Sequence, residues 1–234
     1  MSLSKRLKAV VDMVPAGVTP ADIGCDHGYV AIALIREGKC KRVIASDINK
    51  GPLKRAEEHI KEAGLSDVID LRLSDGVKEI RDGEVDTLII SGMGGLLICD
   101  ILRTAFEKMK DHLNDLILLP HRDIDIVRVF LRKNGFVIED EEMVFEDNKY
   151  YTVIHAVNND RYGGADIAYM SDKSFDDEVN DMFGPVLLMK RSDVFISYLM
   201  HEKAKANDLI TKVTDERRIR ELKERIRIID EVIS

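Results

Sequence analysis

The chain has 234 residues, of which 45% are hydrophobic and 33% are charged, and its formal net charge is −8. This composition is typical of a soluble protein with one full hydrophobic core and a smaller appendage. No apolar run reaches the roughly 18–20 residues of a membrane helix, and the N-terminus lacks the apolar core of a signal peptide. The three cysteines show no C-x-x-C spacing, which disfavours a disulfide framework and a zinc site. We therefore expect a cytoplasmic protein without a metal ion.

The first predicted elements are a helix, a strand and a second helix. Residues 4–14 place their apolar side chains on one helical face, with Ser4 as the N-cap. A strand is expected at about 20–25 and a helix over about 29–37. The junction between them reads Asp22-Ile-Gly-Cys-Asp-His-Gly-Tyr29. In a parallel α/β sheet, such a junction lies at the carboxyl end of a strand, where ligands bind.

This junction differs from a dinucleotide-binding loop at one position. The usual pattern is G-x-G-x-x-G, and this chain has Asp26 where that pattern has a glycine. A carboxylate there would repel a pyrophosphate, which argues against binding of NAD. Gly24 and Gly28 permit a sharp turn and a close approach to a ligand, and the ionisable Asp26 and His27 lie between them.

The predicted second strand, residues 42–47, ends in a carboxylate. Asp47 lies 19 residues after Gly28, a separation at which an acidic residue commonly holds the two hydroxyls of a ligand ribose. The alternative role is that of a loop or helix-capping aspartate, but the preceding glycine loop favours the ribose. A helix is expected over about 50–63, with Asn49 at its N-cap.

The third and fourth predicted strands also end in residues suited to a ligand pocket. The third strand, with Ile69, Leu71 and Leu73 expected inward, runs into Ser74-Asp75-Gly76. Asp75 is suited to accept a hydrogen bond from an adenine amino group, and equally to close an Asx-turn. The fourth strand, residues 85–91, runs into Gly92-Met-Gly-Gly95, whose glycines indicate that backbone lines the pocket there.

After the fifth strand–helix unit, the sequence pattern changes to that of a hairpin. A helix is expected near 96–112, a fifth strand over 115–120 with His121 at its rim, and a helix over 123–134. Residues 136–145 and 149–157 are strand-like runs around a short turn, which predicts a β-hairpin. Five alternating units followed by a hairpin predict an α/β fold with a seven-stranded, mostly parallel sheet that has one antiparallel strand.

Beyond residue 158 the chain changes character. Residues 161–165 are expected to be a connector, and the chain is helical in pattern from about 174, with an interruption at Gly184-Pro185. Two apolar stripes at helical spacing predict two long helices packed as a coiled-coil-like hairpin. Within 217–227, six cations face two anions. An RNA-binding face and an ordinary solvated helix face are equally compatible with that charge pattern.

Taken together, the motifs resemble those of the class I S-adenosylmethionine-dependent methyltransferases. They resemble more closely the bacterial tRNA (adenine-22-N1)-methyltransferase family, TrmK. The most specific strings are Asp-Ile-Gly-Cys-Asp-His-Gly-Tyr and Ser-Gly-Met-Gly-Gly, and the resemblance extends to Met182-Phe-Gly-Pro-Val-Leu-Leu near the C-terminus. It implies a Rossmann-like catalytic domain over residues 1–158 and a helical, coiled-coil-like domain over 159–234 that contacts tRNA. The oligomeric state is open, with a monomer favoured.

The resemblance implies roles for individual residues. The cofactor S-adenosylmethionine would be held by Asp22, Gly24, Gly28, Asp47, Ile48, Asp75, Gly76 and Gly92. The substrate would be contacted by Tyr29, Met93, Gly94, His121, Arg217, Arg218 and Arg220. One departure affects this assignment: a Gln-Pro-Asn type sequence is expected after the fifth strand, and this chain reads Leu119-Pro120-His121.

The implied reaction needs little covalent chemistry from the protein. A sulfonium already activates the methyl group, so the protein mainly supplies alignment and a dry pocket. N1 of adenine has a free lone pair, and a carboxylate that accepts a hydrogen bond from the N6 amine would stabilise the charge that develops on the ring. We expect Asp26 to be that carboxylate, with His27 orienting it or contacting the substrate; the alternative is that both cap the following helix.

Tyr29 is a candidate to stack on the target base, although a tyrosine early in a helix more often packs internally. Three alternative functions are compatible with the same residues. The first is methyl transfer to another RNA base, the second is an NAD-dependent oxidoreductase, and the third is a non-catalytic RNA-binding or coiled-coil assembly module that retains a ligand-binding fold.

Overall fold

The computed structural model describes residues 3–159 and 175–234. The chain divides into two compact units, residues 1–170 and 171–234, and each is described by itself. The connector predicted at 161–165 lies outside the described residues. Among the described helices, none is long and apolar enough to cross a membrane.

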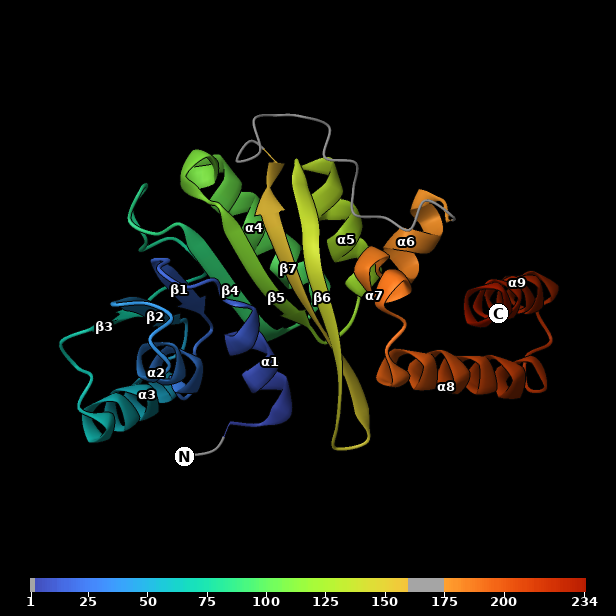
Figure 1. Ribbon diagram of the computed structural model, residues 1–234, viewed down its shortest axis with the longest axis horizontal. Coiled ribbons are helices and arrows are strands. Elements are labelled where there is room, and N and C mark those ends of the chain that lie inside the picture. The colour runs from blue at the N-terminus through green and yellow to red at the C-terminus, as the bar shows by residue number, and fades with distance from the viewer. Residues whose placement is uncertain (1–2, 160–174) are drawn as a thin grey trace. The chain divides into compact units, whose positions relative to one another are not determined.

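The first unit is built on one seven-stranded sheet with the strand order β3-β2-β1-β4-β5-β7-β6 (Figure 1). The strands are β1 Pro20–Ile23, β2 Val43–Asp47, β3 Ile69–Leu73, β4 Thr87–Met93, β5 Asp115–Pro120, β6 Phe136–Glu146 and β7 Lys149–Asn158. β7 runs antiparallel to both of its neighbours, and the other pairs are parallel. The predicted mostly parallel sheet with one antiparallel strand is thus confirmed.

The strand order reverses direction at the β1–β4 pair. From β1 the chain proceeds through β2 to β3, and then crosses back to β4 on the other side of β1. In open α/β sheets, ligands bind outside the carboxyl ends of the strands at such a switch point. The sheet therefore brings the loops after β1, β2 and β4 to one place.

Helices cover both faces of the sheet. They are α1 Lys5–Met13, α2 Tyr29–Arg36, α3 Lys50–Ala63, α4 Gly95–Met109 and α5 Ile124–Lys133, with a 3-10 turn, η1 Lys110–His112, after α4. α1, α2 and α3 share one buried layer with the strands, and right-handed crossovers place α4 and α5 on the other face (Figure 1). The central strands β1, β2 and β5 are buried along their whole length, as parallel strands covered on both faces should be.

One local prediction is wrong, and another is confirmed in position but not in its side-chain bond. Leu73 was expected to point inward, but 45% of its surface is exposed, because β3 is the edge strand and Leu73 lines an open hollow beside α3. Asn49 occupies the N-cap position of α3 without a side-chain capping bond. Its backbone N–H instead donates to Oδ1 of Asp47 at 2.8 Å, so the aspartate organises this turn.

The second unit is helical, with α6 Asp177–Phe183, α7 Pro185–Lys190, α8 Asp193–Ile210 and α9 Glu216–Ile233. α8 and α9 pack antiparallel, since Arg191, just before α8, donates a hydrogen bond to the carbonyl of Ile233 at the end of α9. The buried residues of the two helices are Phe195, Leu199 and Ala206 of α8 and Leu222, Ile229 and Val232 of α9. The predicted helical pair is present, while supercoiling of the pair stays a prediction.

Candidate active site

A cavity of about 710 Å³ opens where the carboxyl ends of β1, β2, β4 and β5 meet. Every loop that was predicted to face a ligand contributes to it. The predicted residues that line it are Asp22, Gly24, Asp26, His27, Tyr29, Asp47, Ile48, Asp75, Gly76, Gly92, Met93 and His121. The topology thus brings the residues of five separate sequence motifs into one pocket, which we take as the candidate active site.

Two predicted residues lie beside this cavity rather than in its lining. Gly28 has a positive φ of 73°, and a side chain there would meet Cβ of Ala56 at 3.3 Å. Its role in the structure is to let the start of α2 pack closely on α3. Gly94 is the N-cap of α4, and a side chain there would meet Nε of Arg122 at 3.0 Å.

The first loop is held against β2 by its backbone. The N–H groups of Gly24 and Cys25 both donate to the carbonyl of Ser46, at 2.8 and 2.9 Å. Gly24 has a φ of +75°, and an added Cβ would lie 2.2 Å from Cε of Met93. A side chain there would be strained by the positive φ and would displace the end of the Met93 side chain from the β4 loop.

Asp26 adopts a conformation that side chains normally avoid. Its φ is +46°, in the left-handed region, which costs a residue with a Cβ on the order of 1 kcal/mol. Its carboxylate is 61% exposed and lies 3.4 Å from Nε2 of His27 and 3.6 Å from a guanidinium nitrogen of Arg55. The structure thus holds an acidic group at the cavity in a strained loop where a glycine would be relaxed.

The helix-capping alternative for Asp26 and His27 is wrong. The N-cap of α2 is Gly28, and no side chain makes a capping hydrogen bond to that helix. Since neither side chain satisfies the start of α2, helix capping does not explain why an aspartate and a histidine lie in this loop.

Asp22 is a buried carboxylate without a partner. Only 1% of its surface is exposed, and neither oxygen has a hydrogen-bond partner among the described residues. Burial, with the nearby charge of Asp47, raises the pKa of Asp22 to about 7. A buried, unsatisfied carboxylate is costly and indicates a missing partner, so this group is suited to receive a cationic or hydrogen-bond-donating part of a ligand.

Asp47 and Asp75 differ in how their carboxylates are engaged. Asp47 accepts hydrogen bonds from the backbone of Asn49 and, at 3.4 Å, of Asp26, which fixes it between the first and second loops. Asp75 forms an exposed ion pair with Lys78, while the hydroxyl of Ser74 donates to the carbonyl of Gly76 and closes the turn. Both residues line the cavity, so a ligand can be bound by its polar groups at this end.

Three aromatic rings stack behind the first loop. The rings of His27, Tyr29 and His59 form a triangular cluster, in which the centroid of Tyr29 lies 5.4 Å from that of His27 and 4.9 Å from that of His59, and the two histidine centroids are 5.7 Å apart. A ring nitrogen of His59 also lies 3.0 Å from the carbonyl of His27. Sequence reasoning missed His59 and Arg55, because both lie in the middle of α3, where the amphipathic pattern reveals the buried face but no ligand contact.

The β4 and β5 loops are joined through their backbones. The N–H of His121 donates to the carbonyl of Met93 at 2.8 Å, and the N–H of Gly95 donates to that of Arg122 at 2.9 Å. The His121 ring lies edge-on to Tyr151 of β7, with 5.7 Å between centroids. Burial, followed by the charges of Arg6 and Lys149, lowers the pKa of His121, so its imidazole is neutral at pH 7.

The three predicted arginines of the second unit lie in the first turns of α9. Arg217 and Arg218 are both paired with Glu221, and Arg220 lies 3.9 Å from Glu216. These are exposed pairs of the kind that contributes little energy, so the arginines can exchange partners. The two units are described separately, and a role for these arginines at the cavity stays a prediction.

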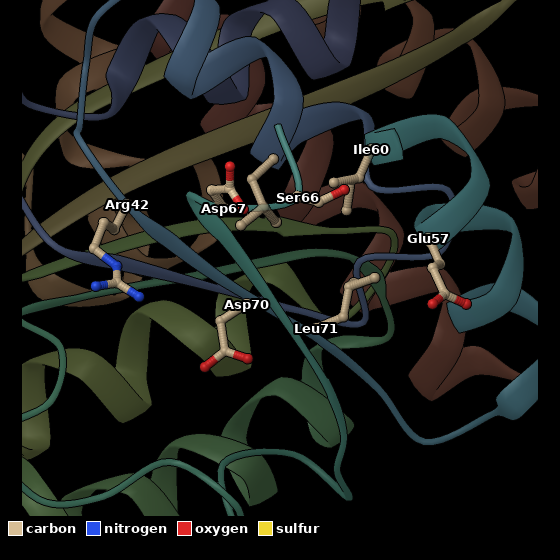
Figure 2. Close-up of a pocket in the computed structure, with 8 residues that line it drawn as sticks. Arg42, Glu57, Ile60, Ser66, Asp67, Asp70 and Leu71 are labelled. Atoms are coloured by element: carbon tan, nitrogen blue, oxygen red, sulfur yellow. The ribbon is translucent and has the colours of Figure 1, made fainter. Parts of the chain in front are cut away.

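A second, smaller hollow lies on the outer side of β3 and α3. Figure 2 shows the side chains of Arg42, Glu57, Asp67 and Asp70 around it. It has no glycine loop and lies away from the switch point of the sheet. Within the described part of the chain, no group of three or more potential ligands is arranged to hold a metal ion. We therefore assign the function to the larger cavity.

The fold and the site together define a class I methyltransferase-type catalytic unit. Residues 3–154 match the family model described as "Methyltransferase domain". The whole chain is 30% identical to the tRNA (adenine(22)-N(1))-methyltransferase of Bacillus subtilis over 240 residues, covering 100% of this chain and 98% of that protein. The chain belongs to this tRNA (adenine(22)-N(1))-methyltransferase family, TrmK, which favours methyl transfer over the NAD-dependent alternative.

Solved structures agree with this membership. A Streptococcus pneumoniae protein described as a candidate tRNA (m1A22) methyltransferase, in complex with S-adenosyl-L-methionine, has a TM-score of 0.86 and 29% identity, covering 100% of both chains. TrmK of M. capricolum, in complex with S-adenosyl-homocysteine, has a TM-score of 0.81 and 27% identity, covering 100% of this chain and 98% of that one. The similarity extends over both units of the chain.

Proposed function

We propose that this protein transfers a methyl group from S-adenosylmethionine to N1 of adenine 22 in tRNA, in the cytoplasm. The observation that carries the proposal is the convergence of Asp22, Asp26 and Asp47 on one cavity at the switch point of a methyltransferase-type sheet. Full-length similarity to the Bacillus subtilis enzyme supports the choice of tRNA and of the adenine position.

The cavity residues fit the proposed cofactor. The unpartnered carboxylate of Asp22 would receive the ammonium of the methionine part, beside the backbone at Gly24. Asp47 would accept hydrogen bonds from the ribose hydroxyls. Asp75 and Gly76 would contact the adenine of the cofactor, with the exposed Ile48 side chain packing on its ring. When bound, the cofactor supplies a methyl group already activated by its sulfonium.

The remaining part of the cavity would receive the acceptor base, and we call it the acceptor half. It is lined by Arg6, Tyr29, Met93 and His121 and reaches Asp26 and His27 at its edge. Asp26 would accept a hydrogen bond from the N6 amine, which keeps the N1 lone pair free and stabilises positive charge on the ring as N1 is methylated. The neutral ring of His121 offers one donor and one acceptor in place of an amide, and Gly94 would leave room for the base.

The nucleotide must leave its helix before it can react. N1 lies on the Watson–Crick edge, so the adenine has to be unpaired or flipped to enter the cavity. Stacking on Tyr29, within its three-ring cluster, would offset part of that cost. The helical region, residues 159–234, would bind the tRNA through its backbone, with Arg217, Arg218 and Arg220 as contacts, and one chain would act as a monomer.

The proposal is tested by methyl incorporation. Labelled S-adenosylmethionine is incubated with the protein and an unmodified tRNA transcript, and with the same transcript carrying guanine at position 22. We expect one methyl group per tRNA, mapped by mass spectrometry to N1 of adenine 22, and none in the guanine variant. Equal incorporation into both transcripts would assign the activity to another base, and absence of incorporation across a full tRNA pool would contradict the proposal.

A further inference from the structure

The acceptor half of the cavity is bounded by an element without an assigned role, the N-terminal helix α1. Leu3, Ser4, Arg6 and Leu7, from its first turn and the residues before it, line the cavity. α1 packs on β5, β6 and β7, next to the tip of the β6–β7 hairpin. Part of the cavity wall is therefore formed by residues that lie outside the motifs which indicated a methyltransferase.

Arg6 is held in a fixed orientation on this wall. Its Nη1 donates to Oε2 of Glu146 at 2.9 Å, and its guanidinium carbon lies 5.1 Å from the centre of the Tyr151 ring. The other oxygen of Glu146 accepts a hydrogen bond from the backbone N–H of Lys5 at 2.6 Å, which also fixes the start of α1. A carboxylate and an aromatic face thus preorganise the guanidinium while 31% of the side chain stays exposed.

Two lysines add positive charge near Arg6. Lys149 is paired in register with Glu146 across the hairpin, and the Lys5 side chain is exposed at the start of α1. Within the part of the chain that the structure describes, neither ammonium forms an ion pair. Arg6 and His121 both line the cavity and both contact the Tyr151 ring. Burial, followed by the charges of Arg6 and Lys149, lowers the pKa of His121. The local carboxylates, Glu146 and Asp147, leave a net positive charge of one, since three cations face two anions.

The fixed guanidinium of Arg6, with the ammonium groups of Lys5 and Lys149 near it, is suited to binding a phosphate. The planar fork of arginine matches phosphate oxygens bidentately, and less entropy is lost on binding when the fork is already oriented. A nucleotide that enters the cavity by its base brings its flanking phosphates to the cavity rim. Given the proposed action on tRNA, on which this step rests, those phosphates need cationic partners near the acceptor half.

We propose that Lys5, Arg6 and Lys149 form a binding site for the RNA phosphates that flank the methyl-acceptor nucleotide, with Arg6 at its centre. Glu146 and Tyr151 are positioning residues that act through Arg6. The site belongs to the RNA and not to the cofactor, because Arg6 lies on the part of the cavity wall that α1 forms, whereas the proposed cofactor residues lie on the β1–β4 loops.

The test separates RNA binding from cofactor binding in the full-length protein. Arg6→Gln, Arg6→Lys and the double variant Lys5→Gln/Lys149→Gln are compared with Lys8→Gln, which removes a charge from the same helix where it is paired with Asp12 and Glu37. tRNA affinity is measured by filter binding from 50 to 300 mM salt, methyl transfer gives kcat and KM, and calorimetry gives the affinity for S-adenosylhomocysteine. Thermal melting identifies any variant that has lost its fold.

We expect Arg6→Gln to weaken tRNA binding about tenfold and to reduce the slope of log K against log salt by about 0.7–0.9. Arg6→Lys should recover only part of the affinity, because it keeps the charge and loses the fork. Affinity for S-adenosylhomocysteine should not change in any variant. If a folded Arg6→Gln protein binds tRNA with the affinity and salt slope of Lys8→Gln, the phosphate site is wrong. tRNA binding is measured without turnover, so this outcome is distinct from failure of wild-type methyl transfer, which would contradict the proposed function.

Discussion

At the scale of single residues, Asp26 gives the clearest separation of function from folding. Its φ of +46° is strained for an aspartate and relaxed for a glycine. We expect Asp26→Gly to keep or raise the free energy of unfolding, by roughly 0.5–1 kcal/mol, while methyl transfer falls at least about a hundredfold. Denaturant unfolding and the methylation assay check the two parts. A variant that is less stable and still active would show that Asp26 serves the fold.

Asp22 predicts a pH dependence of stability. Its folded pKa, about 7, is above its ordinary value of 3.8, so the folded protein retains a proton that the unfolded chain releases between these values. The stability of the ligand-free protein therefore falls as pH rises from about 4 to about 7 and levels off above it. We expect Asp22→Asn to remove this contribution. The free energy of unfolding of the variant minus that of wild type should therefore increase by up to about 4 kcal/mol between pH 4 and pH 7.

The same titration should appear in ligand binding. S-adenosylhomocysteine carries an ammonium group that would favour the ionised Asp22, so wild-type affinity should increase as pH rises through about 7. Asp22→Asn should bind more weakly and with little pH dependence over that range. Calorimetry at pH 6, 7 and 8 measures both proteins. If the affinities of wild type and Asp22→Asn for S-adenosylhomocysteine change with pH in the same way, Asp22 does not contact the ammonium group.

At the scale of elements, two adjacent glycines in the β4–α4 loop are expected to differ. A Cβ on Gly95 would lie 2.4 Å from the carbonyl oxygen of Asp123, which is backbone, whereas a Cβ on Gly94 would meet the flexible side chain of Arg122. Gly95→Ala must therefore push the β5–α5 loop away, at a cost of about 1–3 kcal/mol, and displace His121. Gly94→Ala is the matched control, with a change below about 0.5 kcal/mol. If Gly95→Ala and Gly94→Ala have equal melting temperatures, the close packing of the β4–α4 and β5–α5 loops is contradicted.

The sequence predicts a site residue when the residue lies at the end of a recognisable strand, and fails to predict it when only the folded structure brings it to the site. The β4 and β5 strands could be predicted because continuous apolar runs between glycines and polar residues are typical of buried parallel strands. Asp47 and Gly92 could be predicted because they lie at the carboxyl ends of such strands. Arg6 could not, because the pattern of α1 reveals only its buried face. Its partners Glu146 and Tyr151 are about 140 residues away in the chain, and only the folded hairpin brings them together.

At the scale of the whole molecule, the proposed contribution of α9 to tRNA binding can be separated from general charge. The variant Arg217→Gln/Arg218→Gln/Arg220→Gln removes three cations from the start of α9. The control Arg36→Gln/Lys61→Gln/Lys133→Gln removes three from the last turns of α2, α3 and α5, at the edge of the sheet opposite the cavity. Both variants have the same net charge, so long-range attraction of the polyanion is weakened equally.

Direct phosphate contacts would distinguish these two variants. If all three α9 arginines contact phosphates, the slope of log K for tRNA against log salt should fall by about 2–3 in the first variant and by less than about 1 in the control. KM for tRNA should rise in the first variant with kcat nearly unchanged, since uniform binding is lost and the acceptor half is intact. Equal slopes in the two variants would show that these arginines remain paired with Glu216 and Glu221 and that the tRNA is bound elsewhere.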